Sequence, residues 1–278
     1  MHFLYRHEMQ EITPYIKRLL MSHITGLSMT QLLAEKELCL SEEQQTWYDK
    51  AIVRLQNNEP LQHVLGYCEF YGRKFKCDGR ALVPRPETEE LVDWILHDLS
   101  TFNSQLSTLN SLDIGTGTGC IALSLAKEMK ETKVTAVDIS ADALSLAREN
   151  ANILEVKNVD FIEGDILNKS FNSQLSTFNL IVSNPPYVRE CEKGDMEANV
   201  LDYDPHTALF VSDEDPLIFY RTIAEFALTH LAPNGALYFE INQYLGQETC
   251  DLLIAMGYKN VELKKDINDN PRMIKATI

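Results

Sequence analysis

Asp113-Ile114-Gly115-Thr116-Gly117-Thr118-Gly119 lies between two apolar segments of different periodicity. Residues 109–112 precede it and suit a buried strand, whereas residues 120–126 follow it with a helical apolar pattern. Glycines in such a turn let the backbone approach a ligand, because no Cβ intervenes. The sequence therefore predicts a strand, a glycine-rich turn and a helix, which together form a nucleotide- or cofactor-binding corner.

Acidic residues follow the next two predicted strands. Residues 133–137 form a predicted strand that leads into Asp138, about 20 residues after the glycines, where an acid can bind ribose hydroxyls. Ser140 can cap the helix that follows. A third strand over residues 159–163 leads into Gly164-Asp165. This alternation of strands and helices predicts an α/β fold with a Rossmann-like parallel sheet.

The spacing of the glycines distinguishes between two cofactors. Dinucleotide-binding proteins have Gly-x-Gly-x-x-Gly, in which a pyrophosphate lies on the helix N-terminus. Here the spacing is Gly-x-Gly-x-Gly, with Asp113 at its head. A carboxylate would repel a pyrophosphate and attract a cation, and S-adenosylmethionine carries an ammonium and a sulfonium group without phosphate. The charge argument favours S-adenosylmethionine over NAD. The alternative for Asp113 is a residue that only caps the turn.

Asn184-Pro185-Pro186-Tyr187 follows residues 180–183, an apolar run that we predict to be a buried parallel strand. The prolines cannot donate a backbone N–H, and they restrict Asn184 to extended conformations. The result is a rigid shelf at the carboxyl end of a strand, where open α/β sheets bind ligands. An amide and a tyrosine ring suit a planar group with an NH2, such as an amide or the exocyclic amine of a base. The alternative is a turn that buries the tyrosine.

These motifs, in this order, resemble class I S-adenosylmethionine-dependent methyltransferases that methylate amino groups. Asn-Pro-Pro-Tyr is shared by DNA adenine-N6 methyltransferases and protein-glutamine methyltransferases. Residues 82–92, Leu-Val-Pro-Arg-Pro-Glu-Thr-Glu-Glu-Leu-Val, are similar to the segment that joins the two domains of the peptide chain release factor N5-glutamine methyltransferases, the PrmC/HemK family. Residues 204–209 and 219–221 match the same family, although Asp204-Pro205 replaces its usual Glu-Pro. The resemblance runs from about residue 60 to the end.

The resemblance implies a reaction and individual roles. A methyl group would pass from S-adenosylmethionine, leaving S-adenosylhomocysteine, to the side-chain amide nitrogen (N5) of the glutamine in the Gly-Gly-Gln loop of class I peptide chain release factors. The substrate amide would donate to the Asn184 side-chain oxygen and the Pro185 carbonyl, with Tyr187 packed on its plane; these three are the expected catalytic residues. Arg85 and Glu87 would shape the substrate channel or, alternatively, form an interdomain ion pair. The expected cofactor-binding residues are Asp113, Gly115, Thr116, Gly117, Thr118, Gly119, Asp138, Asp165, Ile166 and Asn184, and the expected substrate-binding residues are Asn184, Pro185, Pro186, Tyr187, Arg85 and Glu87.

The net charge and the composition limit the classes of partner that we expect for this protein. The formal net charge of −16 argues against a stable nucleic-acid partner, which needs a positive face, and suits a basic protein partner. No apolar run reaches the ~18 residues of a membrane span, and the first residues lack the apolar core of a signal peptide. The six cysteines are scattered without Cys-x-x-Cys spacing, so we expect reduced thiols in a cytoplasmic protein and no metal site. We also expect a monomer without membrane contact. Adenine-N6 methylation of nucleic acid and non-catalytic binding of S-adenosylmethionine remain the alternative functions.

The predicted organisation is a small N-terminal domain, a linker and a catalytic domain. Residues 1–65 have apolar residues at helical spacing, and we expect a helical substrate-docking domain there, with docking implied by the resemblance. Residues 66–84 are predicted to form a β-hairpin linker, and residues 85–278 the S-adenosylmethionine-dependent methyltransferase domain. A repeated segment, residues 102–110 and 171–179, differs at one position between its copies. We expect both copies to be surface loops.

Overall fold

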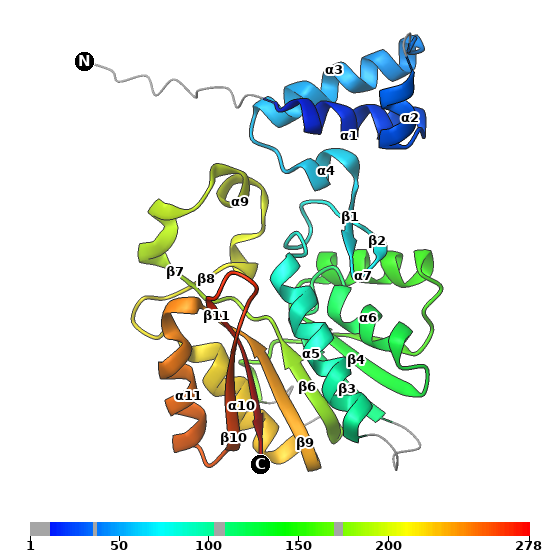
Figure 1. The fold of residues 1–278 in the computed structure, drawn as a ribbon. Helices are drawn as coiled ribbons and strands as arrows, with labels where there is room; N and C mark the ends of the chain where they lie inside the picture. The colour runs from blue at the N-terminus through cyan, green and yellow to red at the C-terminus, as the bar shows by residue number, and fades with distance from the viewer. Residues whose placement is uncertain (1–11, 36–37, 103–108, 170–174) are drawn as a thin grey trace, which may run out of the picture. The chain divides into compact units, whose positions relative to one another are not determined.

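The computed structural model describes residues 12–35, 38–102, 109–169 and 175–278 (Figure 1). The chain divides into two compact units. The first contains the described residues up to Tyr67 together with residues 196–203, and the second contains residues 68–195 and 204–278. The second unit carries the large sheet and both motifs from which the function was predicted.

The first unit is helical, as predicted. The Ser41 side chain accepts from the Gln44 backbone N–H, and the Gln44 side chain accepts from the Ser41 N–H at 2.9 Å, which is a complete capping box. Leu20 and Leu55 are buried in its small core. The Tyr203 hydroxyl donates to the Asn57 carbonyl at 2.8 Å, within the same unit. The helices are α1 (Pro14–Thr25), α2 (Met29–Ala34), α3 (Glu42–Gln56), α4 (Leu61–Leu65) and α9 (Ala198–Tyr203).

In the described part of the second unit, seven strands form one sheet in the order β10-β11-β9-β6-β3-β4-β5. Neighbouring pairs from β9 to β5 are parallel, whereas β11 runs antiparallel to both β9 and β10. The four strands predicted between residues 109 and 183 are present as β3, β4, β5 and β6, and β6 begins two residues earlier than predicted. The strands are β3 (Leu109–Ile114), β4 (Thr132–Asp138), β5 (Val159–Glu163), β6 (Phe178–Ser183), β9 (Leu231–Glu240), β10 (Lys259–Lys265) and β11 (Pro271–Thr277).

Helices cover both faces of this sheet (Figure 1). In β6, Leu180 and Val182 pack into the cluster that contains residues of α5, α6 and α7, whereas Ile181 packs into the cluster of α10 and α11. This alternation follows from the two-residue period of a strand, and it explains why residues 180–182 of β6 are all apolar. The helices are α5 (Pro86–Phe102), α6 (Cys120–Glu128), α7 (Ala141–Ile153), α10 (Ile218–His230) and α11 (Gly246–Ala255).

The predicted hairpin is present as β1 (Tyr67–Phe70) and β2 (Arg73–Lys76). Phe70 and Phe75 are buried in the same cluster as residues of α5, so the hairpin is anchored within the second unit by apolar contacts. The remaining short elements are β7 (Val188–Arg189), η1 (Glu190–Asp195), η2 (His206–Ala208), β8 (Phe210–Val211) and η3 (Gln243–Leu245).

The repeated segment leads into two strands that are neighbours in the sheet. Residues 103–108 of the first copy and 171–174 of the second lie outside the described residues. The expectation of loops is wrong at the end of both copies, because residues 109–110 belong to β3 and residues 178–179 to β6, and Phe102 is the last residue of α5. The Asn110 N–H donates to Asn179 Oδ1 at 3.0 Å, so the two copies meet side by side at the amino ends of β3 and β6.

The strand order creates the crevice that can hold a ligand. From β3 the chain proceeds to β4 and β5 on one side, and then returns to β6 on the other side. Ligands bind at the carboxyl ends of strands where an open sheet reverses its order in this way. Ser183 Oγ donates to the Ile114 carbonyl at 2.7 Å and joins the two strand ends there. The two predicted motifs therefore begin next to each other.

Candidate active site

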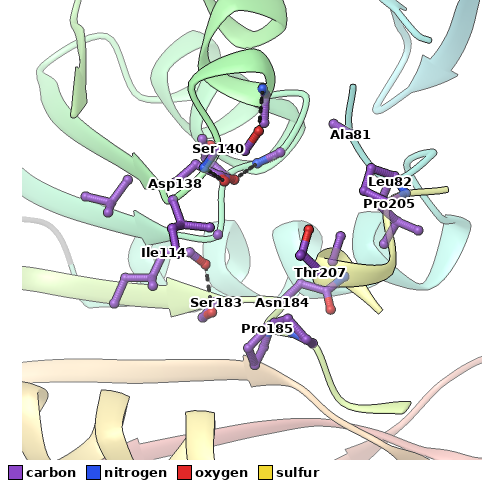
Figure 2. A pocket seen from close by; sticks show the side chains of 18 of the residues that line it. Ala81, Leu82, Ile114, Asp138, Ser140, Ser183, Asn184, Pro185, Pro205 and Thr207 are labelled. Carbon is purple, nitrogen blue, oxygen red and sulfur yellow. Dashed lines mark hydrogen bonds between the residues drawn. The ribbon is translucent and has the colours of Figure 1, made fainter. Parts of the chain in front are cut away.

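A cavity of about 400 Å³ opens at the carboxyl ends of β3, β4 and β6, within the usual volume range of small-molecule sites. Figure 2 shows Asp138 and Ser140 on one side, and Leu82 and Pro205 on the other, with Asn184 and Pro185 between them. The predicted site residues in its lining are Gly115, Thr116, Gly117, Thr118, Asp138, Asp165, Ile166, Asn184, Pro185, Pro186 and Arg85. Asp113, Gly119, Tyr187 and Glu87 are not in the lining.

The glycine turn uses its backbone amides within the protein. The N–H groups of Gly115 and Thr116 donate to the Val137 carbonyl at 2.8 and 3.0 Å. The Gly117 N–H donates to Asp138 Oδ2 at 2.9 Å, and the Gly119 N–H donates to the Thr116 carbonyl at 2.8 Å. A phosphate-binding turn needs such amides for its ligand. This turn therefore suits a cofactor without phosphate.

Gly119 is required for the close packing of α6 against α7. Its φ of +82° is a left-handed conformation that favours glycine. A Cβ on it would lie 3.1 Å from Leu123 Cδ1 and 3.2 Å from the Ala147 Cβ. The third glycine of the turn thus allows α6 and α7 to approach each other, which is a structural requirement of the site and not a contact with a ligand.

Asp113 lies behind the turn and not in the cavity. Its Oδ2 accepts from Thr116 Oγ1 at 2.6 Å and from the Ala122 N–H at 3.2 Å, while Oδ1 has no hydrogen-bond partner among the described residues. Burial raises the pKa of Asp113 to about 7, against the two hydrogen bonds, which lower it. Its position corresponds to the alternative in which Asp113 holds the turn.

Asp138 and Asp165 present carboxylates to the cavity. Asp138 Oδ2 accepts from Gly117, and its Oδ1 accepts from the Ser140 N–H at 2.9 Å, so two backbone amides fix the orientation of this side chain. Burial is the main cause of the raised pKa of Asp138. Asp165 Oδ1 accepts from the Leu167 N–H at 2.8 Å. Each carboxylate oxygen has a further lone pair for a ligand hydroxyl or amine.

Asn184 and Pro185 form the cavity side of the predicted shelf, but Tyr187 points away from it. Asn184 Nδ2 donates to Thr88 Oγ1 at 3.2 Å. The Tyr187 hydroxyl donates to Glu240 Oε1 at 3.1 Å, and its backbone N–H donates to the Leu209 carbonyl. Burial raises the pKa of Tyr187 well above its ordinary value, with a further contribution from the charge of Glu240. The tyrosine supports the shelf from behind.

Arg85 lines the cavity and forms an ion pair. Its guanidinium lies 3.0 Å from Asp204 Oδ2, and Asp204 is buried. Both residues belong to the second unit, so this ion pair lies within one unit and is not the interdomain pair given as the alternative for Arg85 and Glu87. Asp204 Oδ1 also accepts from the Val83 N–H at 3.4 Å. Asp204 thus holds residues 83–85, which we call the entry segment, against the cavity.

Sequence reasoning missed Thr88 and Glu240. Thr88 lies inside the Pro-Glu-Thr-Glu segment that carried the resemblance, and Glu240 is a charged residue at the end of the apolar strand β9. Thr88 Oγ1 donates to Glu240 Oε2 at 2.6 Å. An acid at the end of an otherwise buried strand is a signal of a buried polar partner, but that signal does not identify the partner.

The sheet with its antiparallel β11, the turn without a phosphate site and the amide at the strand end define a class I methyltransferase. A "Methyltransferase domain" model matches residues 106–278, and a "PrmC N-terminal domain" model matches residues 9–66. The chain resembles a methyltransferase structure from Pyrococcus furiosus with a TM-score of 0.54, 20% identity, and coverage of 83% of this chain and 100% of the other. That likeness confirms the predicted fold.

Two curated relatives identify the family. The release factor glutamine methyltransferase of Flavobacterium psychrophilum is 48% identical over 90% of this chain and 86% of its own. That of Bacteroides thetaiotaomicron is 44% identical over 98% of this chain and 96% of its own. The chain belongs to the release factor glutamine methyltransferase family, as the motifs predicted. Membership implies that it is an enzyme and that S-adenosylmethionine is the methyl donor.

The buried Asp113 predicts a dependence of stability on pH. Between pH ~4, the ordinary Asp pKa, and about 7, the folded state holds a proton at Asp113 that the unfolded chain has released. Stability from this group is therefore greatest at low pH and is lost as the pH rises through this range. Asp113→Asn does not titrate, so from pH 5 to 8 it should lose about 2–3 kcal/mol less than the wild type.

Urea unfolding of the ligand-free protein at both pH values measures this difference. Asp142→Asn makes the same charge change at an exposed position in α7 and should keep the pH dependence of the wild type. An Asp113→Asn protein that loses as much stability as the wild type between pH 5 and 8 would contradict the prediction.

Proposed function

We propose that this enzyme methylates the side-chain amide nitrogen (N5) of the glutamine in the Gly-Gly-Gln loop of class I peptide chain release factors. The observation that carries the proposal is the position of Asn184 and Pro185, which line the same cavity as the glycine turn. An amide acceptor beside a methyl-donor site suits a substrate that is itself a carboxamide. The names of the two curated relatives support the release factor as the substrate.

Asn184 and Pro185 would orient the substrate amide. S-adenosylmethionine, when bound, supplies a methyl group activated by a positively charged sulfur. An amide nitrogen is a poor nucleophile because its lone pair is delocalised into the carbonyl group. Hydrogen bonds from its N–H groups to Asn184 Oδ1 and to the Pro185 carbonyl would increase the electron density on the nitrogen and align its lone pair with the methyl group. A proton can leave to water after transfer, so no side chain is required as a general base.

The cavity also offers partners for each part of the cofactor. Asp138 is suited to the ribose hydroxyls, Asp165 and Ile166 to the edge and face of the adenine, and the turn from Gly115 to Thr118 to the methionine part. We propose that Asp113 and Gly119 act indirectly, because they hold the turn and the helix packing. Likewise, Tyr187 would support the shelf and not pack on the substrate.

The partner would be a basic protein surface. The formal net charge of −16 would favour encounter with such a partner and disfavour nucleic acid. We propose that residues 1–65 form the docking domain, and that residues 66–84 link it to the catalytic domain of residues 85–278. We also propose that the enzyme is a monomer and that it acts in the cytoplasm. Within the described ranges, no helix has both the length and the apolar character needed to cross a bilayer.

Parallel assays of methyl transfer test the function. Labelled S-adenosylmethionine is supplied with a purified release factor or with adenine-containing duplex DNA, and the product is analysed by mass spectrometry. We expect label on the Gly-Gly-Gln glutamine and none on DNA. Label on adenine would instead support the alternative nucleic-acid function, and cofactor binding without transfer to either would support a non-catalytic role.

Asn184→Ala should lower the transfer rate by roughly 10²–10³-fold, as does loss of one oriented hydrogen-bonding group in other active sites. The dissociation constant for S-adenosylmethionine should change little, because the main cofactor contacts are elsewhere. Single-turnover rates and calorimetry measure the two effects. Asn152→Ala, an exposed change on α7, is the matched control. A variant that keeps most of its activity would rule out the shelf.

Asp138→Ala should weaken binding of S-adenosylmethionine by roughly 10–100-fold, because hydrogen bonds from the ribose hydroxyls to a charged carboxylate are lost. Calorimetry with the purified protein gives the dissociation constant directly. Asp142→Ala, at an exposed position in the first turn of α7, should bind like the wild type. An unchanged dissociation constant in Asp138→Ala would reject the ribose contact.

A further inference from the structure

We propose that Thr88 and Glu240 fix the orientation of the Asn184 side-chain amide, so that its oxygen and not its NH2 group is available to the substrate. The inference rests on the proposed function, in which the substrate is a carboxamide. Both are positioning residues, since they act through Asn184. Glu240 is buried at the carboxyl end of β9, and Thr88 is buried in the first turn of α5.

The direction of each hydrogen bond follows from the number of protons available. With Glu240 ionised, its carboxylate can only accept, and the Thr88 hydroxyl has one hydrogen to donate. Burial raises the pKa of Glu240, whereas the hydrogen bonds from Thr88 and Tyr187 and the charge of Arg272 favour the ionised form. Thr88 Oγ1 donates that hydrogen to Glu240 Oε2 at 2.6 Å. Toward Asn184, at 3.2 Å, the same oxygen can therefore only accept. The Asn184 NH2 group must lie on the Thr88 side, and Oδ1 takes the opposite side of the amide.

Tyr187 makes this arrangement rigid. Its hydroxyl donates to the second carboxylate oxygen of Glu240 at 3.1 Å, so both oxygens of the buried acid have a donor. Asn242 Nδ2 donates to the Tyr187 backbone carbonyl at 2.9 Å and holds the tyrosine segment. A buried polar network whose members all have partners is rigid and specifies one arrangement. The chain of donors runs from Asn184 through Thr88 to Glu240.

The fixed orientation would select the substrate. A glutamine amide has an N–H group that can donate to Asn184 Oδ1, whereas a glutamate carboxylate has none and would face that oxygen with its negative charge. A site built to accept N–H groups discriminates strongly against an analogue that lacks them. If the Asn184 amide could rotate, its NH2 group would accommodate the carboxylate, and discrimination would fall.

Substitutions at Thr88 separate orientation from general stability. Thr88→Val keeps the shape and removes the hydroxyl, whereas Thr88→Ser retains the hydroxyl. Thr132→Val makes the same change at a buried position at the amino end of β4, opposite the site. Glu240→Gln provides a second test should Thr88→Val not fold, because a donor then replaces one acceptor and the Thr88 hydroxyl can donate to Asn184.

Nuclear magnetic resonance of the free enzyme reports the orientation directly. The Asn184 side-chain NH2 signal is identified by its absence from the Asn184→Ala spectrum. In Thr88→Val we expect this signal to move and its hydrogen exchange to accelerate at least tenfold, whereas Thr88→Ser and Thr132→Val should keep the wild-type behaviour. An unchanged signal and exchange rate in Thr88→Val would overturn the proposal, whatever the substrate of the enzyme is.

Binding of release factors tests whether the fixed orientation of Asn184 selects glutamine over glutamate. Dissociation constants are measured with S-adenosylhomocysteine present, for a release factor with its Gly-Gly-Gln glutamine and for its Gln→Glu version. The preference for glutamine should fall at least about tenfold in Thr88→Val and be restored in Thr88→Ser. An undiminished preference would also overturn the proposal. A wild-type enzyme that binds neither version would refute the proposed function, while the resonance experiment would still decide the orientation.

Discussion

The parallel pairing of β3 with β6 is the interaction on which the site depends. Ile114 and Ser183 are register partners at the ends of these strands, and Ser183 Oγ donates to the Ile114 carbonyl. The pairing brings the glycine turn and the Asn-Pro-Pro-Tyr shelf to the same edge of the sheet, although they are far apart in the sequence. Because the chain leaves β3 and enters β6 on opposite sides, neither segment covers the crevice between them.

The backbone amides of the glycine turn form hydrogen bonds within the protein, and these bonds explain which cofactor the crevice suits. The turn amides bond to Val137, Asp138 and Thr116, so the turn has the shape of a nucleotide-binding corner without its anion site. The buried carboxyl group of Asp113 helps to hold this shape from behind. The same residues that close the turn also leave Asp138 fixed at the cavity, where a ribose would lie in the proposed complex.

Buried carboxylates recur around the cavity of this acidic protein. Asp113, Asp204 and Glu240 are all buried, and burial of a carboxylate is costly unless hydrogen bonds or a cation compensate. Asp204 has Arg85, and Glu240 has two hydroxyl donors. Each of these acids holds a different part of the wall: the turn, the entry segment and the shelf. Their cost in stability is consistent with a role in orientation.

The strands, the turn, the cap at Ser140 and the position of Asn184 at a strand end were predictable from local patterns, because periodicity, glycine, proline and capping residues act over a few neighbouring positions. Short motifs were also enough to predict the family. The contact of Tyr187 with Glu240, and the link from Asn184 through Thr88 to that acid, became visible in the folded chain alone. The tertiary structure likewise placed residues 196–203 with the first unit. These outcomes depend on hydrogen bonds and packing between distant segments, whose partners no local pattern specifies.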